Sequence, residues 1–469
     1  MKKMRFIIFA LSAFILTSLS AAPTILEVEY KDVTVDGKTV KVATIEQPDG
    51  TWGYYGEKGG EFDVIVKNKL DTPTVIHWHG LILPDSQDGV SGVTQLNPID
   101  LGKEYHYKFK LVQSGTYWMH SHYGMQEQEL VEAPFIITTA DDKDYKQVVV
   151  MFQDFSFKSP SENLKELQSQ SPKDDTMKID NKAMPGMAMN KEEAAPDLND
   201  VKYDAFLTNY HTDDNPEVVK VKPEEKVKLR FIDGSAATNY WVTLGGLKGQ
   251  LIAVDGQSVK PIEVEKIQLA LGQRADVIVT IPKEGGTYQI LGQVEGLKAQ
   301  TGIILTAEAK AEGFKIETEA SEATPALNYD QDFLLHSLDK LLPELSTDTV
   351  RVKLSGDMDK YIWKINDQVW PDITPIKVKQ NQRIVMIIDN ETMMSHPMHL
   401  HGYDFKITNI NGKSVDGPFR DTVLVQPMST VIIQFDAINA GKWMFHCHNI
   451  YHMAAGMMTY IDVIGVKEN

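Results

Sequence analysis

Short runs rich in apolar β-branched and aromatic residues recur along the whole chain, with polar turn residues between them. Six of the clearest runs are Phe62–Val66, Tyr105–Leu111, Val148–Phe152, Val227–Phe231, Ala275–Ile281 and Thr430–Phe435. Gly, Pro, Asn and Asp separate such runs, which is typical of short strands joined by turns. The chain is therefore predicted to be all-β and built from β-sandwich domains.

One sequence module occurs three times, and each copy begins with a glycine followed two positions later by an aromatic residue. The three glycines are Gly115, Gly286 and Gly441. The positions five and seven after the glycine hold His120 and His122, Leu291 and Gln293, and His446 and His448. The first and third modules thus carry histidine pairs, and the middle module has lost them.

The repeat divides the chain into three domains after a leader. We expect a signal peptide at 1–21, a first domain at 22–141, a second at 142–310, a linker at 311–331 and a third domain at 332–469. Residues 158–200 interrupt the second domain and are polar and rich in methionine. This segment is predicted to be a mobile insertion without a core element.

The N-terminus predicts export. Lys2, Lys3 and Arg5 precede an apolar run over residues 6–19, and small residues follow, so cleavage after Ala21 is expected. The run is short for a membrane span, which favours a Sec-type signal peptide over the alternative of a single anchoring helix. The mature protein is then periplasmic, with no stable membrane insertion.

Composition excludes several classes of function. Lys+Arg number 47 and Asp+Glu number 65, for a formal net charge of −18, which makes the chain a poor binder of nucleic acid or anionic membranes. The single cysteine rules out an intramolecular disulfide framework and Cys-rich zinc or iron–sulfur sites.

Ten of the 13 histidines form four clusters. The clusters are His77-Trp-His79, His120-Ser-His122, His396-Pro-Met-His399-Leu-His401 and His446-Cys-His448-Asn-Ile-Tyr-His452. Histidines at positions i and i+2 of a strand point to the same face, about 6.6 Å apart. If the first and third domains pack with these faces together, eight imidazoles converge, which suits a cluster of copper ions.

The triplet around Cys447 is the most informative, because a strand places Cys447 on the face opposite His446 and His448. With His396, His452 and Met457, the thiolate completes the ligand set of a blue-copper site with a weak axial Met. The alternative is that each His-x-His pair consists of ordinary strand histidines. It does not account for four such pairs, two per module, with the only cysteine between the two histidines of one pair. Zinc fits less well, since a structural zinc site does not need this many histidines.

These motifs resemble those of the three-domain multicopper oxidases. The motifs are His-Trp-His-Gly from His77, Trp-Met-His-Ser-His ending at His122, His-Pro-Met-His-Leu-His-Gly from His396, and His-Cys-His-x3-His-x4-Met from His446. The stretches His77–Val90, Gln113–Gln128, Val227–Gln257 and Tyr451–Met457 look like the periplasmic copper-resistance branch. The resemblance implies three consecutive cupredoxin-like Greek-key β-sandwich domains.

The resemblance also implies four copper ions that reduce dioxygen to water. It assigns the type 1 copper to His396, Cys447, His452 and Met457, and the type 2 copper to His77 and His399. It assigns the type 3 pair to His79, His120 and His448 for one ion, and to His122, His401 and His446 for the other.

Two acids are candidates for helping protons reach oxygen. Asp88 matches the family acid near the cluster, and its alternative is a turn residue before Gly89. Met453 stands where some relatives carry an acid, so the second donor is open. Glu127 is a candidate, with a solvated surface residue as the favoured alternative.

The electron donor is expected to be Cu(I), because thioethers are soft ligands that select it. The candidate methionines of the insertion are Met177, Met184, Met187 and Met189, and an adaptable linker is the alternative. Met394 matches a Cu(I)-lining position of some cuprous oxidases, with ordinary packing as its alternative. Those enzymes carry an acidic residue two positions before this methionine. In this chain that position is Thr392, and Glu391 is the adjacent residue.

The predicted function is a periplasmic oxidase of Cu(I) in copper tolerance. A laccase-like oxidase of phenols or catechols and a non-catalytic copper store are the alternatives. The expected partners are dioxygen and Cu(I) or a small organic reductant, without nucleic acid, and the protein is expected to be a monomer.

Overall fold

The computed structural model describes residues 22–465, apart from residues 96, 170–197, 310–312 and 344. Six sheets form three successive two-sheet sandwiches, so the predicted all-β fold is confirmed. All six predicted runs are strands, each within three residues of its expected ends. The clustered methionines of the insertion and the proposed signal peptide lie outside the described residues.

The first domain pairs a sheet of order β2-β1-β4-β6 with one of order β3-β8-β7-β5. Its strands are β1 Thr24–Val35, β2 Lys38–Glu46, β3 Tyr54–Glu57, β4 Glu61–Asn68, β5 Ile76–His79, β6 Glu104–Lys110, β7 Gly115–Ser121 and β8 Glu132–Thr138. Three short 3-10 helices, η1 Asp85–Gln87, η2 Gln126–Glu129 and η3 Ala140–Asp144, lie in the connections. Alternate residues of β4 are buried, as expected for a strand with one face on the core.

The second domain pairs a sheet of order β10-β9-β12-β17-β14-β15 with one of order β11-β19-β18-β13-β16. Its strands are β9 Lys146–Phe155, β10 Ala205–Thr208, β11 Val218–Lys220, β12 Lys226–Asp233, β13 Tyr240–Thr243, β14 Gly249–Val254, β15 Gln257–Val264, β16 Lys266–Leu269, β17 Arg274–Thr280, β18 Thr287–Val294 and β19 Gln300–Thr306. A short helix, α2 Asp330–Leu334, follows this domain.

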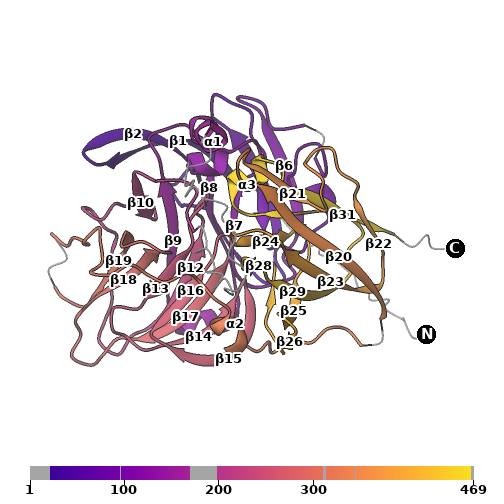
Figure 1. Cartoon of the computed structure of the whole chain (residues 1–469). Helices are drawn as coiled ribbons and strands as arrows, with labels where there is room; N and C mark the ends of the chain where they lie inside the picture. Colours follow the sequence, from indigo (N-terminus) through magenta and orange to yellow (C-terminus); the bar gives the residue numbers. More distant parts are fainter. Residues whose placement is uncertain (1–21, 96, 170–197, 310–312, 344, 466–469) are drawn as a thin grey trace, which may run out of the picture.

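The third domain pairs a sheet of order β21-β20-β23-β29-β25-β26, with β27 beside β25, and a sheet of order β22-β31-β30-β24-β28. Its strands are β20 Ser346–Asp357, β21 Ile362–Ile365, β22 Ile376–Lys379, β23 Gln382–Asn390, β24 His396–Leu400, β25 Phe405–Ile410, β26 Lys413–Ser414, β27 Phe419–Arg420, β28 Thr422–Val425, β29 Thr430–Asp436, β30 Gly441–Cys447 and β31 Met458–Ile464. Helix α3, Ile450–Ala454, follows β30. Figure 1 shows β7 and β24 near the middle of the molecule, with the second domain (pink) on one side and the third (orange to yellow) on the other.

The start of the insertion corrects one expectation, because residues 160–169 form helix α1, Pro160–Ser169. Leu167 is buried and Leu164 packs against the core of the third domain. Ser159 directly precedes the helix. Its hydroxyl donates to the Glu162 carboxylate (2.7 Å), and its N–H donates to the same group (2.8 Å). This Ser-Pro-x-Glu start and the two leucines are a helix signal that the polar composition of the segment concealed.

None of the helices in the described part of the chain has the length and apolar character needed to cross a bilayer.

Candidate metal centre

Two pairs of neighbouring strands, from the first and third domains, carry the clustered histidines. β5 pairs with β7 so that His77 lies opposite His120, and β24 pairs with β30 so that His399 lies opposite His446. Each histidine-bearing face is turned toward the other domain. The rings of His77 and His401 stack with centroids 3.7 Å apart, and His79 and His399 stack at the same distance.

The ring nitrogens of these residues meet in a small volume. His79 Nδ1 lies 3.2 Å from His448 Nε2. His446 Nε2 lies 3.1 Å from His401 Nε2 and 3.5 Å from His122 Nε2. Within each of three sets of histidines, one ring nitrogen per residue lies within 4.8 Å of the others, so each set could hold a metal ion. The sets are His77, His79 and His120; His77, His399 and His401; and His122, His401 and His446.

The buried Nε2 atoms of His77, His120 and His399 have no hydrogen-bond partner among the described residues. The opposite nitrogen of each ring is held by a backbone carbonyl. His77 Nδ1 lies 2.9 Å from Asp88 O, and His399 Nδ1 lies 2.9 Å from Asp421 O. Because buried polar atoms are rarely left unpaired, oriented Nε2 lone pairs without partners fit metal ligation.

Burial favours the neutral form of several of these imidazoles. Burial and the neighbouring His399 lower the pKa of His446 to about 3. Burial lowers the pKa of His79, His120 and His401 well below the ordinary value, and nearby histidines add to the effect. A neutral imidazole is the form that binds a metal ion, so this electrostatic environment favours ligation at neutral pH.

A second group of ligand atoms lies inside the third domain. Cys447 Sγ is 3.5 Å from His452 Nδ1 and 3.7 Å from His396 Nδ1, and the two nitrogens are 3.1 Å apart. Met457 is buried in the same core, and its carbonyl accepts from the Cys447 N–H (3.1 Å). Asn449 caps helix α3 and so fixes the position of His452. A cysteine sulfur and two imidazoles, with a methionine in the same core, match the donor set of a blue-copper site.

Both candidate acids contact cluster histidines. Asp88 Oδ2 lies 2.9 Å from His401 Nδ1. Glu127 Oε2 lies 2.9 Å from His120 Nδ1, and Glu127 Oε1 lies 3.5 Å from His448 Nδ1. Glu127 is 2% exposed, so the favoured expectation of a solvated surface residue is wrong. Burial raises the pKa of Glu127 well above the ordinary value.

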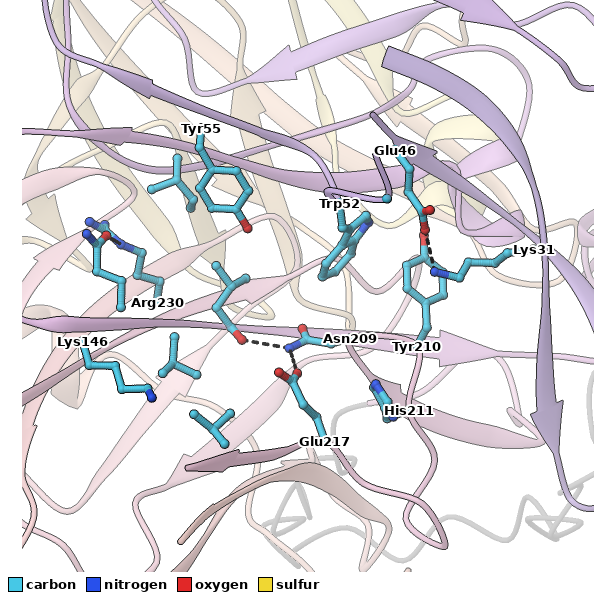
Figure 2. A pocket seen from close by; sticks show the side chains of 16 residues that line it. Lys31, Glu46, Trp52, Tyr55, Lys146, Asn209, Tyr210, His211, Glu217 and Arg230 are labelled. Carbon is cyan, nitrogen blue, oxygen red and sulfur yellow. Dashed lines mark hydrogen bonds and ion pairs between the residues drawn. The ribbon is translucent and has the colours of Figure 1, made fainter. Parts of the chain in front are cut away.

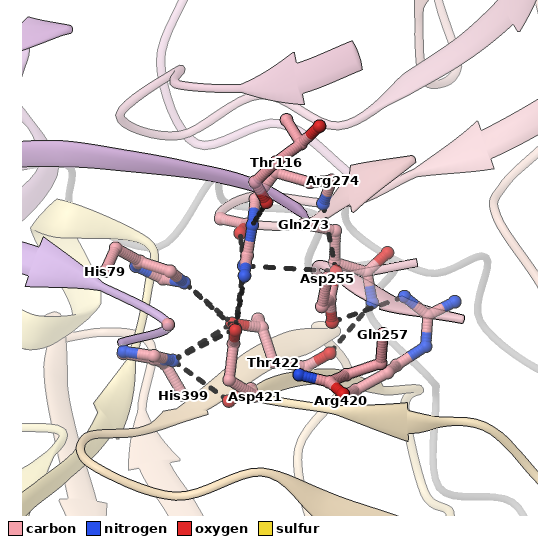
Figure 3. A network of polar contacts seen from close by, with 12 residues as sticks. His79, Thr116, Asp255, Gln257, Gln273, Arg274, His399, Arg420, Asp421 and Thr422 are labelled. Atoms are coloured by element: carbon pink, nitrogen blue, oxygen red, sulfur yellow. Dashed lines mark hydrogen bonds and ion pairs between the residues drawn. The ribbon is translucent and has the colours of Figure 1, made fainter. Parts of the chain in front are cut away.

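Asp421 is a third acid at the cluster, and the sequence reasoning missed it. Asp421 Oδ1 lies 3.1 Å from His79 Nε2, and Arg274 of the second domain pairs with both Asp421 oxygens (Figure 3). Burial by itself would raise the pKa of Asp421, but Arg274 holds it well below its ordinary value. No spacing in the sequence links Asp421 to the histidine motifs, because the contact forms between domains.

Asp200, at the end of the insertion, was missed too. Its Oδ2 atom lies 2.8 Å from His452 Nε2 and also accepts from the Tyr361 hydroxyl (2.8 Å). The Asp200 side chain is 3% exposed, although its surroundings in the sequence are polar. A carboxylate therefore lies on the outer nitrogen of a candidate blue-copper ligand.

Of the residues near His396 that were considered for Cu(I), one contacts its ring, one is exposed and one is buried in the core. The Thr392 hydroxyl lies 2.8 Å from His396 Nε2, while Glu391 is exposed and extends toward Lys353 (4.0 Å). Met394 is 4% exposed and packs in the core of the third domain, which agrees with its packing alternative.

A pocket of about 440 Å³ lies between the first and second domains, away from these groups (Figure 2). Its charged side chains are paired with protein groups: Lys31 with Glu46 (2.5 Å) and Glu217 with Asn209 (2.6 Å). Its histidine, His211, lies outside the four motifs and contacts the Asn215 carbonyl (3.0 Å). The clustered histidine nitrogens, rather than this pocket, are the candidate site.

Comparison with known proteins agrees with this geometry. Family models described as "Multicopper oxidase" match residues 27–142, 146–308 and 344–464. The chain belongs to the multicopper oxidase family. It is therefore an oxidoreductase with several copper ions, and the buried imidazole and thiol groups fit such ions.

Among curated relatives, Multicopper oxidase MmcO of Mycobacterium tuberculosis is 30% identical over 87% of this chain and 80% of its own length. Copper resistance protein A of Escherichia coli is 26% identical over 87% of both chains. The crystal structure of Fet3p, titled as a multicopper oxidase that functions in iron import, shares the fold, with a TM-score of 0.74 and 18% identity over 94% of this chain and 90% of that chain.

Gly272 of the second domain tests how closely the cluster is packed. Its φ is +74°, and a Cβ atom there would lie 2.9 Å from His448 Cδ2 and 3.1 Å from His79 Cε1. We expect Gly272→Ala to destabilise the protein by about 1–3 kcal/mol through the strained backbone. It should also lower the copper content, because the added methyl group displaces the ligand rings.

Gly246→Ala is the matched control, since Gly246 has a φ of +84° and no atom within 4 Å of an added Cβ. It should lose stability in denaturant unfolding yet retain copper, as measured by elemental mass spectrometry. Equal copper content in the two variants would contradict the close packing of Gly272 on the histidines.

Proposed function

We propose that this multicopper oxidase oxidises Cu(I) to Cu(II) in the periplasm, as part of copper tolerance. Four Cu(I) ions each lose one electron, and one dioxygen takes up four electrons and four protons to give two water molecules. Four resident copper ions are proposed, one at Cys447 and three among the eight clustered imidazoles. Export is proposed from the basic and apolar start of the chain.

The arrangement around Cys447 is the observation that carries this proposal. Cys447 Sγ faces His396 and His452 in the core, while His446 and His448, its two chain neighbours, reach the cluster. His446 Nδ1 also contacts the Cys447 carbonyl (2.9 Å). A short covalent and hydrogen-bonded path thus joins the two groups of ligands, as transfer of electrons between them requires.

The ligand roles proposed here are those that the family motifs imply, and two of the sets also lie together in the structure: His122, His401 and His446, and His396, Cys447 and His452. We assign the type 1 site to His396, Cys447, His452 and Met457, the type 2 site to His77 and His399, and the type 3 pair to His79, His120 and His448 and to His122, His401 and His446. When bound, copper supplies the one-electron redox chemistry that takes electrons singly from the donor and delivers them to dioxygen. Several of the histidines, among them His77, His399 and His401, hold their lone pairs in place because a protein acceptor fixes the second nitrogen.

Asp88 and Glu127 are proposed to orient the ligands and to help protons reach the cluster. Each carboxylate lies 2.9 Å from one ligand ring, His401 for Asp88 and His120 for Glu127. Both acids are buried, so a proton held on either is sheltered from bulk water.

Three observations favour Cu(I) as the donor. Asp200 lies on His452, where a carboxylate attracts a cation. Relatives include Copper resistance protein A of Escherichia coli and Pseudomonas syringae. Met177, Met184, Met187 and Met189 are proposed to collect Cu(I), with Met394 and Glu391 as weaker candidates. A laccase-like oxidation of phenols is the second candidate, because a laccase of Arthroderma benhamiae is 25% identical.

Cys447→Ser is expected to abolish both the intense blue absorption and turnover. The thiolate is the proposed copper ligand and part of the electron path, and a hydroxyl replaces neither function. Visible spectra and oxygen uptake of the copper-loaded variant measure this. Retained oxidase activity would contradict the type 1 assignment.

His77→Ala is expected to give a blue but inactive protein. The residues around Cys447 remain intact, while the cluster loses one buried Nε2 atom. The blue absorption serves as the internal control for folding, and oxygen uptake measures activity. Normal oxygen reduction by this variant would show that His77 is not a cluster ligand.

Changing Met177, Met184, Met187 and Met189 together to Ser should raise the apparent KM for Cu(I) and leave phenol oxidation unchanged or faster. Thioethers assist a soft cation, whereas an organic donor gains nothing from them. Steady-state oxygen uptake with each donor measures the difference. Unchanged kinetics with Cu(I) would support the alternative that the segment is a linker. Equal losses of activity with both donors would indicate a role in folding.

A further inference from the structure

The second domain supplies none of the proposed copper ligands, yet one of its side chains reaches the cluster. Arg274 begins β17 and is fully buried, and its guanidinium lies against the Asp421 carboxylate of the third domain (Figure 3). Its Nη1 atom lies 2.7 Å from Asp421 Oδ1, and its Nη2 atom bonds Asp421 Oδ2. This is the two-bond geometry that arginine forms with a carboxylate.

Asp421 in turn contacts two proposed ligands. Its Oδ1 atom lies 3.1 Å from His79 Nε2 and 3.5 Å from His399 Nδ1. With the proton of His79 on Nε2, the Nδ1 lone pair is directed at the cluster, where it lies 3.2 Å from His448 Nε2. His79 is thus oriented through its Nε2 atom, whereas His77 and His399 leave Nε2 free.

Arg274 is itself fixed on every side. Its Nε donates to the Thr116 carbonyl of the first domain (3.2 Å), and Nη1 donates to the Gly272 carbonyl (2.8 Å). Its backbone N–H donates to Asp255 Oδ1 (2.9 Å), and Asp255 is 3.4 Å from Arg420. The Arg274 side chain is thus held by all three domains, and its fixed position in turn fixes the position of the Asp421 carboxylate.

We propose that Arg274 is a positioning residue of the trinuclear centre, which sets the orientation of His79 and His399 through Asp421. The inference rests on the proposed function in one respect, the assignment of these two histidines as copper ligands. It gives the domain without ligands a direct part in the centre. Without Arg274, the buried Asp421 carboxylate loses its counter-charge and two of its donors, a costly arrangement that favours a different position.

Arg230 provides a matched control within the same sheet. It lies on β12, beside β17, is 1% exposed, and pairs with Asp142 and Asp276 (2.9 Å each). It even bonds the same first-domain residue as Arg274, through the Thr116 hydroxyl (2.9 Å). Arg274 reaches the histidines through Asp421. The side-chain partners of Arg230 are Gln147, Thr116, Asp276 and Asp142, and none of their side chains contacts a cluster histidine in the described part of the chain, so removing Arg230 tests for general destabilisation alone.

The experiment compares Arg274→Gln, Arg274→Lys and Arg230→Gln in the full chain. We measure copper per chain, copper retention against a chelator, the blue absorption, and the electron paramagnetic resonance signal of the non-blue copper. In Arg274→Gln, copper at the cluster should bind about 10- to 100-fold more weakly, as for other partners of metal ligands. The non-blue signal should change, while the blue absorption of the Cys447 site should stay.

Arg274→Lys keeps the charge but not the paired bonds, so it should fall between Arg274→Gln and the wild type. It also carries the test if the glutamine variant does not fold. Arg230→Gln should retain wild-type copper and both spectroscopic signatures, whatever its loss of stability.

Two outcomes would overturn the inference. One is equal retention of cluster copper in Arg274→Gln and Arg230→Gln. The other is that Arg274→Gln and Arg230→Gln each lose cluster copper and blue copper to the same extent, which would mean general destabilisation. A wild-type protein without copper at these histidines would instead contradict the proposed function, so the two failures are distinguishable.

Discussion

The structure depends on the burial of neutral imidazoles between two domains. Eight histidine rings from β5, β7, β24, β30 and the residues that follow them meet at the interface of the first and third domains. Burying so many polar rings costs free energy unless each nitrogen has a partner. Protein acceptors satisfy one nitrogen of rings such as His77 and His399, and a metal ion is the partner that suits the other.

The remaining architecture holds this arrangement in place. Asp88 and Glu127 of the first domain contact rings of the cluster, and Asp421 of the third domain contacts the Nε2 atom of His79. The second domain covers the cluster with Gly272 and reaches Asp421 with Arg274. A domain that has lost its ligands therefore remains necessary for the geometry of the ligands of its neighbours. The Cys447 strand then links this interface to the core of the third domain.

Local pattern was enough to predict the all-β fold and the residues that meet at the site. Alternation along a strand separates His446 from Cys447, and that local rule needs no knowledge of tertiary contacts. Asp421, Arg274 and Asp200 were missed because their partners are distant in sequence, up to 342 residues for Asp421 and His79. Glu127 was misjudged because its burial depends on tertiary packing, and its carboxylate lies beside His448 of the third domain. The composition of the insertion also concealed α1, although Ser159 and Glu162 are a local helix start.

The central claim is that one set of copper ions lies among the buried imidazoles and another ion lies at Cys447. Anomalous X-ray diffraction at the copper absorption edge, from crystals of the copper-loaded protein, tests this most directly. The account predicts one copper peak within bonding distance of Cys447 Sγ, His396 Nδ1 and His452 Nδ1. It also predicts three further peaks among the eight clustered imidazoles, one of them shared by His77 Nε2 and His399 Nε2 and another bonded to His120 Nε2. Copper found only at surface methionines or carboxylates, with the buried imidazoles free of metal, would contradict it.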